Sequence, residues 1–533
     1  MVSTRVRFLL SLAVVTLFGL EPGALQGLRV NAPLIPDGDV SPFFALSPDS
    51  RFSVFVADGD RDEVHELYSV RLGPPFERIK LNDEFLPGHE VQALSTALSI
   101  SPDSRRVLFL ADADFNNVYA LYSVPIDGSE SPLKLNGTLP FGVSVEAGFL
   151  IAPDSSRVVY QAGRKVFSVP LEGGVAVQLN GPLPAGAHVD SFGISSDSAR
   201  VVYVADEDVS GVHEIFSVPI NGSSAPVRLN GPLVAGGDVI PQVDISSDSS
   251  RVVYVADEDV DEIRELFSVP IDGSSAPVQL NGPLVAGGTV ISGFLSISSD
   301  SSRVVYSADE VTNEVFELFS VPLDGGAAPV RLNGSLVAGG DVDYPSVWLA
   351  PDASRVVYRA DEHTNDRLEL FSAPIDGSSP SVKLHPSLLF GQSVGQVRIT
   401  PDSSRVVYVS NAIQSFKNEL FSVPIDASSA PVKLNPTPVF NGDVLDFALD
   451  PKGRSVLYKG NVLDADLFEL FSAPIDGSSP SRRVNRHLPA GGGTWNYVFT
   501  ADGRRALYTG KQDDPDRMEL YLSYLTPIYR RAP

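Results

Sequence analysis

Apolar and polar residues follow one another in short blocks along this chain, without the period of a helix. In one representative unit we expect strands at residues 243–246, 251–256, 265–271 and 277–280. The second of these segments is almost entirely Val, Tyr and Ala, which is typical of a strand buried on both faces. Asp272-Gly273, between the third and fourth segments, is a hairpin signal. The pattern therefore predicts four short antiparallel strands in about 50 residues.

This unit recurs along the chain. The turn before its second strand usually reads Pro-Asp-x-x-Arg or Ser-Asp-x-x-Arg, and the acid of the turn marks each copy. The copies stand at Asp49, Asp103, Asp154, Asp197, Asp248, Asp300, Asp352, Asp402 and Asp502, with Lys452 replacing the acid in one further copy. These ten units lie 43 to 54 residues apart, a period typical of repeat folds. Four strands per repeat form the blade of a β-propeller, in which neighbouring blades cover both faces of each sheet.

The two ends of the chain complement each other. Residues 28–40 match residues 278–290, a stretch that begins with the fourth strand of its unit. The unit after Asp502 has second and third strands but stops before a fourth. We therefore predict that the N-terminal strand completes the last blade, because this closure hides both free sheet edges. The expected fold is an all-β propeller of ten blades in one closed ring over residues 25–533; two smaller rings are the alternative.

The turn and strand at Ser101–Phe109, Ala350–Tyr358 and Thr400–Tyr408, followed by segments such as ELFSVPIDG, resemble the WD40-like (PD40) repeat of TolB-type propellers. The resemblance implies a propeller fold. Members of this family include proteins of periplasmic translocation systems and the propeller domains of prolyl-oligopeptidase-like peptidases. This chain shows neither the N-terminal α/β domain of TolB nor an α/β-hydrolase domain, so we expect no peptidase activity. TolB has six blades, so the resemblance does not carry TolB's partners over.

The first 24 residues have the pattern of a signal peptide. Arg5 and Arg7 precede an apolar run at Phe8–Leu20, which is short for a membrane span but suits the core of a leader. Ala24 is the expected last residue of the leader, and an uncleaved anchor is the alternative. No other segment resembles a membrane span. The sequence therefore predicts export to the periplasm or the exterior.

Composition narrows the choice of partners. The chain is 43% hydrophobic, so it folds, and its formal net charge of −26 argues against nucleic acid or an anionic membrane surface as a partner. The charge favours cations, or protein partners with basic patches. The chain has no cysteine, which excludes disulfides and thiolate metal sites.

Acidic residues gather between the second and third strands of most units. These segments span 57–66, 111–117, 205–214, 256–265, 308–317, 360–369 and 511–519. In a four-stranded blade such connections lie on the same face as the blade-to-blade connections, so we expect a broken circle of carboxylates on one face. The third unit breaks the circle, because its connection shrinks to QAGRKV at 161–166 and is basic.

Two of these segments contain alternating acids of the kind found in calcium loops. The candidate ligands are Asp58, Asp60 and Asp62 in the first unit and Asp257, Asp259 and Asp261 in the fifth. The full loop pattern needs a glycine at its sixth position, where this chain has Glu63 and Glu262. The alternative is a solvated hairpin whose charge keeps the face soluble. Apart from possible calcium, we expect no cofactor.

Other candidate chemistry is sparse. The seven histidines show no clustering and no metal-binding helical spacing, and we expect them to be ordinary surface residues. An enzyme would need unrepeated acids at the central channel, for which Asp244, Asp343 and Asp446 on the expected innermost strands are candidates.

The sequence therefore predicts a monomeric, exported, non-enzymatic propeller that binds or scaffolds a protein partner through its acidic face. Repeated loops at fixed spacing suit such a role, because several weak contacts add. The alternatives are a propeller hydrolase or lyase acting on glycans or peptides at the channel mouth, and a calcium-stabilised surface protein.

Overall fold

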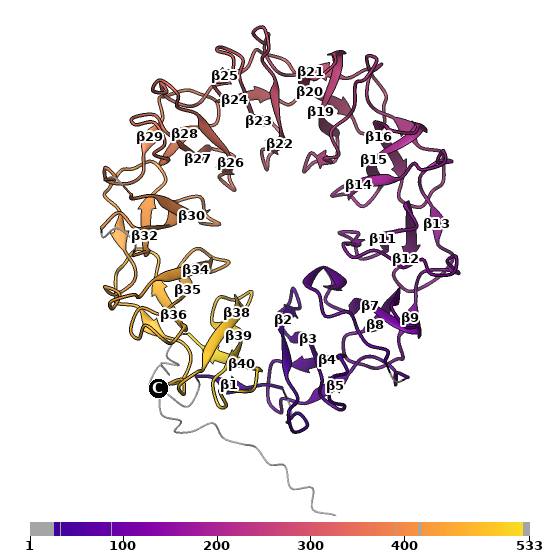
Figure 1. The fold of residues 1–533 in the computed structure, drawn as a ribbon, viewed down its shortest axis with the longest axis vertical. Helices are drawn as coiled ribbons and strands as arrows, with labels where there is room; N and C mark the ends of the chain where they lie inside the picture. Colours follow the sequence, from indigo (N-terminus) through magenta and orange to yellow (C-terminus); the bar gives the residue numbers. More distant parts are fainter. Residues whose placement is uncertain (1–25, 32, 87, 390, 414–416, 526–533) are drawn as a thin grey trace, which may run out of the picture.

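The computed structural model describes residues 26–31, 33–86, 88–389, 391–413 and 417–525, and the expected signal peptide lies outside them. Within these residues the strands form ten four-stranded antiparallel sheets. The sheets stand around a circle with their innermost strands toward the centre (Figure 1). One short 3-10 helix, η2 (Ser95–Ala97), precedes the second sheet. Among the described residues, no helix has the length and apolar character that crossing a membrane requires.

The inner half of each blade holds its first and second strands. The first strands are β2 (Val40–Leu46), β6 (Leu98–Ile100), β10 (Leu150–Ile151), β14 (Val189–Ile194), β18 (Asp244–Ile245), β22 (Val290–Ile297), β26 (Val342–Leu349), β30 (Val394–Ile399), β34 (Val444–Leu449) and β38 (Gly493–Phe499). The second strands are β3 (Phe52–Ala57), β7 (Arg106–Phe115), β11 (Arg157–Ala162), β15 (Arg200–Val209), β19 (Arg251–Val260), β23 (Arg303–Ala308), β27 (Arg355–Ala360), β31 (Arg405–Ser410), β35 (Ser455–Gly460) and β39 (Arg505–Lys511). We number blades 1 to 10 in this order.

The outer half of each blade holds the third and fourth strands. The third strands are β4 (Glu66–Arg71), β8 (Val118–Pro125), β12 (Lys165–Pro170), β16 (Val212–Pro219), β20 (Ile263–Pro270), β24 (Glu317–Pro322), β28 (Glu369–Pro374), β32 (Glu419–Pro424), β36 (Glu469–Pro474) and β40 (Glu519–Tyr524). The fourth strands are β5 (Arg78–Lys80), β9 (Leu133–Lys134), β13 (Val177–Gln178), β17 (Val227–Arg228), β21 (Val278–Gln279), β25 (Val330–Arg331), β29 (Val382–Lys383), β33 (Val432–Lys433), β37 (Arg482–Arg483) and, for blade 10, β1 (Leu28–Arg29).

The hydrophobic core lies between blades. In blade 5, Tyr254 on the second strand stands opposite Phe267 on the third, with the rings stacked at 5.4 Å. This face packs against Val202 and Val204 of blade 4. The other face of blade 5, with Val253 at its centre, packs against blade 6. Each blade therefore needs apolar residues on both faces, as the sequence predicts.

The ring closes through the chain ends, and the prediction of one ten-bladed propeller is confirmed. Strand β1 pairs antiparallel with β40, with Leu28 opposite Leu522. Val30 is fully buried in a cluster that joins Phe55 of blade 1 to Leu507 of blade 10. Figure 1 shows the first and last blades side by side at this seam.

The Ser-Asp-x-x-Arg turn links neighbouring blades on the face away from the acidic segments. Ser246 Oγ donates to Asp248 Oδ1 at 2.6 Å, and the Asp248 amide donates to Ser301 Oγ of the next blade at 3.0 Å. Hydrogen bonds from Ser246 and from Ser250 hold the pKa of Asp248 below its usual range. Arg251 Nε donates to Ser268 Oγ within the blade. The motif that carries the family resemblance therefore has a structural role in this ring.

Candidate binding face

The connections between second and third strands meet the blade-to-blade connections on one side of the ring, which we call the connection face. In blade 5, the Asp257 amide donates to the Asp238 carbonyl of the preceding connection at 3.3 Å. In three blades the acidic segment is not the predicted loop. Strands β7, β15 and β19 continue through it, because an apolar pair such as Val260 and Ile263 still pairs across the end of the hairpin.

In blades 1, 2 and 4 to 7 the first acid of the acidic segment accepts a backbone amide of the preceding connection. Asp257 is buried, with Oδ1 accepting from the Asp238 amide at 2.5 Å and Oδ2 from the Glu262 amide at 3.1 Å. The same two contacts, one to the connection and one to the hairpin turn, are made by Asp112, Asp206, Asp309 and Asp361. Blades 8 and 9 use Asn411 and Asn461 at this position. These side chains hold the backbone instead of facing a partner.

The second acid joins one blade to the next. Glu258 Oε1 accepts from the Tyr254 hydroxyl and from the Gly231 amide, both at 2.8 Å, and Gly231 follows the fourth strand of blade 4. Burial raises the pKa of the Glu258 carboxyl. A Cβ at Gly231 would lie 2.4 Å from the Glu258 carboxylate, so a larger residue there would displace this side chain. Glu310 and Glu362 repeat the arrangement.

A third set of carboxylates is paired with cations inside the blades. In blade 6, Glu317 at the start of β24 lies 2.8 Å from Arg331 on β25. Equivalent ion pairs are Glu66–Lys80, Glu214–Arg228, Glu369–Lys383, Glu419–Lys433, Glu469–Arg483 and Glu519–Arg29. Much of the acidic charge on this side of the ring therefore stabilises the fold.

The six calcium candidates are placed differently from one another. Asp58 accepts from the Asp39 amide, and Asp60 forms an ion pair with Arg78 at 2.7 Å. Asp257 is buried as described, whereas Asp62, Asp259 and Asp261 are exposed. Neither set brings three ligand atoms within 4.8 Å of one another in the part of the chain that the structure describes. Calcium binding by these segments stays a prediction.

Exposed apolar residues also recur on the connection face. In six blades such a residue lies in the hairpin between the second and third strands: Phe115, Val209, Val260, Val311, Ile413 and Leu463 are each 52 to 62% exposed. The blade-to-blade connections add Leu86, Phe141, Leu389 and Phe440, at 66 to 94%. Phe115 and Phe141 meet edge to face at 6.2 Å. The expectations from the sequence do not include this set. Its signal in the sequence is a hydrophobic residue eight or nine positions after the start of the second strand in each of the six blades.

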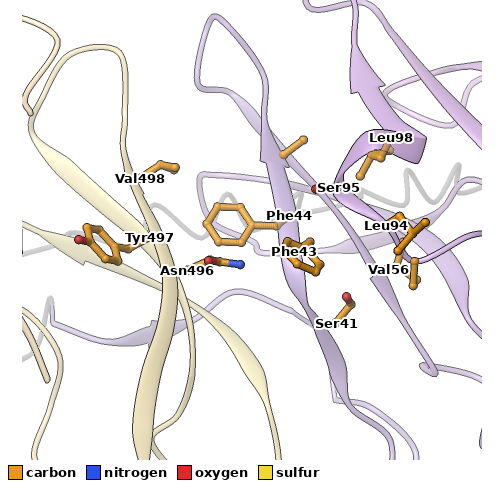
Figure 2. Close-up of a pocket in the computed structure, with 12 residues that line it drawn as sticks. Ser41, Phe43, Phe44, Val56, Leu94, Ser95, Leu98, Asn496, Tyr497 and Val498 are labelled. Atoms are coloured by element: carbon orange, nitrogen blue, oxygen red, sulfur yellow. The ribbon is translucent and has the colours of Figure 1, made fainter. Parts of the chain in front are cut away.

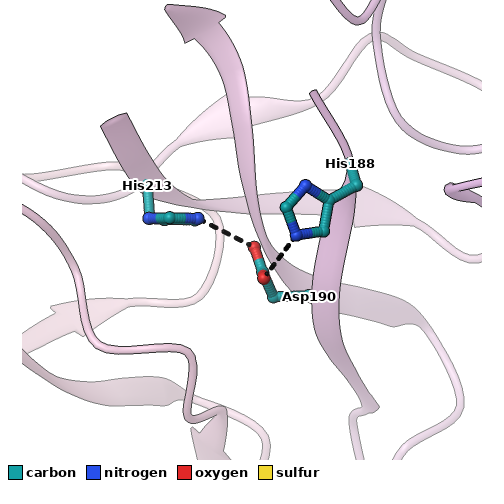
Figure 3. Close-up of side chains that lie close together, drawn as sticks. All are labelled: His188, Asp190 and His213. Atoms are coloured by element: carbon teal, nitrogen blue, oxygen red, sulfur yellow. Dashed lines mark ion pairs between the residues drawn. The ribbon is translucent and has the colours of Figure 1, made fainter. Parts of the chain in front are cut away.

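Two histidines come together, which corrects the expectation that the histidines do not cluster. His188, Asp190 and His213 meet in blade 4 (Figure 3). His188 Nε2 lies 3.0 Å from Asp190 Oδ1, and His213 Nε2 lies 3.4 Å from Asp190 Oδ2. The other histidines that form ion pairs, His65 and His363, each face a single glutamate.

The three innermost acids lie on first strands, as predicted, but in alternate blades. Asp343 on β26 pairs with Arg359 at 2.7 Å, and Asp446 on β34 lies 3.2 Å from Lys459 Nζ. Burial raises the pKa of Asp244 on β18 to about 6. None of the three belongs to a group of converging ligand atoms within the described residues.

A cavity of 260 Å³ opens at the seam between blades 10, 1 and 2 (Figure 2). Its lining is mainly apolar, with Phe43 and Phe44 of β2 at its centre and Leu94 and Tyr497 at its sides. The volume is below the roughly 300–1,000 Å³ of typical ligand pockets. Residues of the first, second and last blades line this cavity.

No protein-family model and no curated protein matches the chain. Similar solved structures include an oligogalacturonate lyase in complex with manganese, at 15% identity and a TM-score of 0.35, covering 74% of this chain and 98% of that one. A putative TolB from Agrobacterium tumefaciens has 15% identity and a TM-score of 0.27, covering 54% and 90%. Dipeptidyl peptidase 4 from Porphyromonas gingivalis has 11% identity and a TM-score of 0.41, covering 91% and 57%. At these values the similarity assigns no function to this chain.

Proposed function

We propose that the protein is an exported, non-enzymatic binding module that holds a polypeptide partner on the connection face. The observation that carries this proposal is the exposed apolar residue that recurs in the hairpin between the second and third strands of six blades. The ring presents these residues in blades 2, 4, 5, 6, 8 and 9 on one face, so that several weak contacts with one partner add.

Charge defines the chemistry of the partner. Val260 stands between Asp259 and Asp261, which are exposed, and Val209 follows the exposed Asp208. The structural carboxylates nearby are already paired, and Asp208 itself lies 3.6 Å from Arg228. Asp259 and Asp261 are therefore the acids that meet a partner. A polypeptide with alternating basic and apolar side chains fits this surface. Fully burying one such apolar side chain contributes about 1.5–3 kcal/mol, and roughly half of that is left to gain where the residue is already half-buried.

The test uses two peptides, one alternating lysine with leucine and one alternating glutamate with leucine. We expect only the basic peptide to bind, with affinity falling as salt rises. The combined variant Val209→Ser, Val260→Ser and Val311→Ser is expected to weaken binding at least about tenfold, or 1.4 kcal/mol.

We call the exposed apolar residues between the second and third strands the apolar tips. The matched control changes exposed valines that lie away from the apolar tips. Val175 lies in the hairpin between the third and fourth strands of blade 3, and Val227 lies on a fourth strand; they are 83% and 40% exposed. The variant Val175→Ser, Val227→Ser should bind the basic peptide like the parent chain. Equal binding by all three proteins would reject the connection face as the binding surface.

The two alternatives have less support. A propeller hydrolase or lyase needs acids that converge at the channel, and Asp244, Asp343 and Asp446 lie in separate blades. A calcium-stabilised protein needs loop oxygens free for the ion, and Asp58, Asp60 and Asp257 already have protein partners. The repeated apolar tips favour the binding module over both.

A further inference from the structure

Blade 4 carries a group of side chains that the fold does not require. His188 lies in the connection that enters β14, Asp190 lies on β14, and His213 lies on β16, so three segments of one blade meet on the connection face (Figure 3). In blade 5 the equivalent residues are Asp238, Ile240 and Arg264. Blade 5 has the same four-stranded pattern without these groups, so the cluster is a local departure from the repeat.

The distances suit a single metal ion. One ligand atom from each of the three side chains lies within 4.8 Å of the other two. The two imidazole Nε2 atoms approach the two oxygens of Asp190 at 3.0 and 3.4 Å. A tetrahedral ion with bonds of about 2.0–2.1 Å holds its ligand atoms roughly 3.3 Å apart. Two imidazoles and one carboxylate form a donor set for first-row transition metals, whereas calcium prefers oxygen alone.

Each imidazole has a second carboxylate behind it. His213 Nδ1 lies 3.3 Å from Asp238 Oδ1, and His188 Nδ1 lies 3.7 Å from Asp206 Oδ1. The same two oxygens accept the backbone amides of His213 and His188, both at 2.6 Å, which fixes their positions. Metal-binding histidines in proteins usually direct their other ring nitrogen at a carboxylate or carbonyl, which sets the ring orientation. His213 makes this contact as a hydrogen bond, whereas the 3.7 Å between His188 Nδ1 and Asp206 Oδ1 is longer than a hydrogen bond.

Asp190 is aimed at the imidazoles by an irregularity in its strand. The register between β14 and β15 shifts between Val189 and Ser191, so Asp190 is the extra residue of a bulge. Bulges next to functional sites redirect side chains in this way. Asp190 Oδ2 is buried, and no donor among the described residues points at it in hydrogen-bond geometry. A buried carboxylate oxygen without a donor is costly unless a cation takes that role.

The neighbouring blade leaves the cluster open. The hairpin of blade 3 ends at Gly163 and Arg164, and the Arg164 carbonyl accepts the Val189 amide at 3.0 Å, just beside the cluster. The His188 side chain is 44% exposed and that of His213 is 24% exposed. Solvent therefore reaches the side of the cluster that the three protein ligands leave free.

We propose that His188, Asp190 and His213 bind one divalent first-row transition-metal ion, with Zn²⁺ as the reference ion and at least one coordination position open to solvent. The site does not depend on the proposed partner. Three protein ligands with an open position are the arrangement of reactive rather than purely structural zinc sites.

The test is a metal titration of the chain from residue 25 onward, after EDTA treatment and desalting, in excess calcium. Excess calcium fills weak sites formed by surface carboxylates. The Zn²⁺ binding that calorimetry still measures therefore reports the His188–Asp190–His213 site. We expect one Zn²⁺ per chain. We also expect Co²⁺ to give the visible absorption of a four- or five-coordinate ion with nitrogen ligands.

The variants decide which residues hold the ion. Asp190→Asn and His213→Asn should abolish the stoichiometric binding and the Co²⁺ absorption, and Asp238→Asn should weaken affinity about 10–100-fold through the orientation of His213. The control is His65→Asn, which removes a histidine paired with Glu90 at 2.8 Å elsewhere on the same face.

Three outcomes would overturn the proposal: no Zn²⁺ binding by the parent chain in calcium, binding that persists in Asp190→Asn, or equal loss in the His65→Asn control. A misfolded variant is recognised by its circular dichroism spectrum. In that case the Co²⁺ spectrum of the parent chain still decides, because six-coordinate oxygen-only binding gives weak absorption and would contradict the imidazole ligands.

Discussion

Removing the closing strand should open the ring at one defined seam. The perturbation is a chain that begins at residue 32 and therefore lacks β1. In the intact chain the Val30 amide donates to the Leu520 carbonyl at 2.9 Å, and the Leu520 amide donates to Asn31 Oδ1 at 3.0 Å. Val30 is fully buried, and Arg29 pairs with the buried Glu519 at 2.8 Å.

The magnitude follows from these contacts. Burying Val30 is worth about 1.5–3 kcal/mol. Each lost hydrogen bond of the β1–β40 pair costs about 0.5–1.5 kcal/mol, because water replaces the missing partner at the newly exposed edge. Val30 and the two hydrogen bonds named above together predict a destabilisation of about 2.5–6 kcal/mol for the last blade. The exposed edge of β40 also becomes a site for pairing between chains.

The assay combines urea unfolding with amide hydrogen exchange. We expect a lower unfolding midpoint, and faster exchange that is concentrated in β38 to β40 and in blade 1. A synthetic peptide of residues 25–36, added to the shortened chain, should restore protection in β40, whereas a scrambled peptide of the same composition should not. Unchanged exchange in β40 after the deletion would refute the reasoning that β1 holds the seam closed.

Two further predictions concern the acidic segments. Asp257→Ala removes the acceptor of two backbone amides and should destabilise the protein by about 2–4 kcal/mol in urea unfolding. Asp257→Asn should cost less, because asparagine occupies this position in blades 8 and 9. Equal losses of stability in the two variants would show that the oxygen contacts are unimportant. Millimolar calcium added after EDTA should raise the Tm by less than about 2 °C, since Asp58, Asp60 and Asp257 already have protein partners. A large rise would mean that these loops bind the ion.

Most of the fold was predictable because each unit repeats the same local signals. Strand order and closure follow from counting strands at the two ends of the chain. The roles of the acids were not predictable in this way. Asp257 and Glu258 are neighbours in sequence, but the first accepts from its own preceding connection and the second from Gly231 of the previous blade. Only the packing of one blade on the next shows which carboxylates are used internally.

The histidine cluster illustrates the same limit. His188 and His213 stand 25 residues apart with no metal-ligand spacing between them, and they meet only because the connection and the third strand of blade 4 reach one face. Aligning the repeats against each other would have exposed the signal: three positions carry His, Asp and His in blade 4, where blade 5 has Asp, Ile and Arg.

The departures from the repeat matter because a regular ring by itself has no preferred orientation. A partner held only by equivalent tips has several nearly equivalent ways to bind, and its affinity comes from the number of contacts. The short basic hairpin of blade 3 and the His188–Asp190–His213 cluster of blade 4 lie next to each other and occur once among the described blades. A metal ion there, with a position open to a partner's carboxylate or imidazole, would fix one orientation on the ring. The two proposals are therefore separable by experiment: loss of the tips should weaken binding in every orientation, whereas loss of Asp190 should leave binding of the simple basic peptide intact.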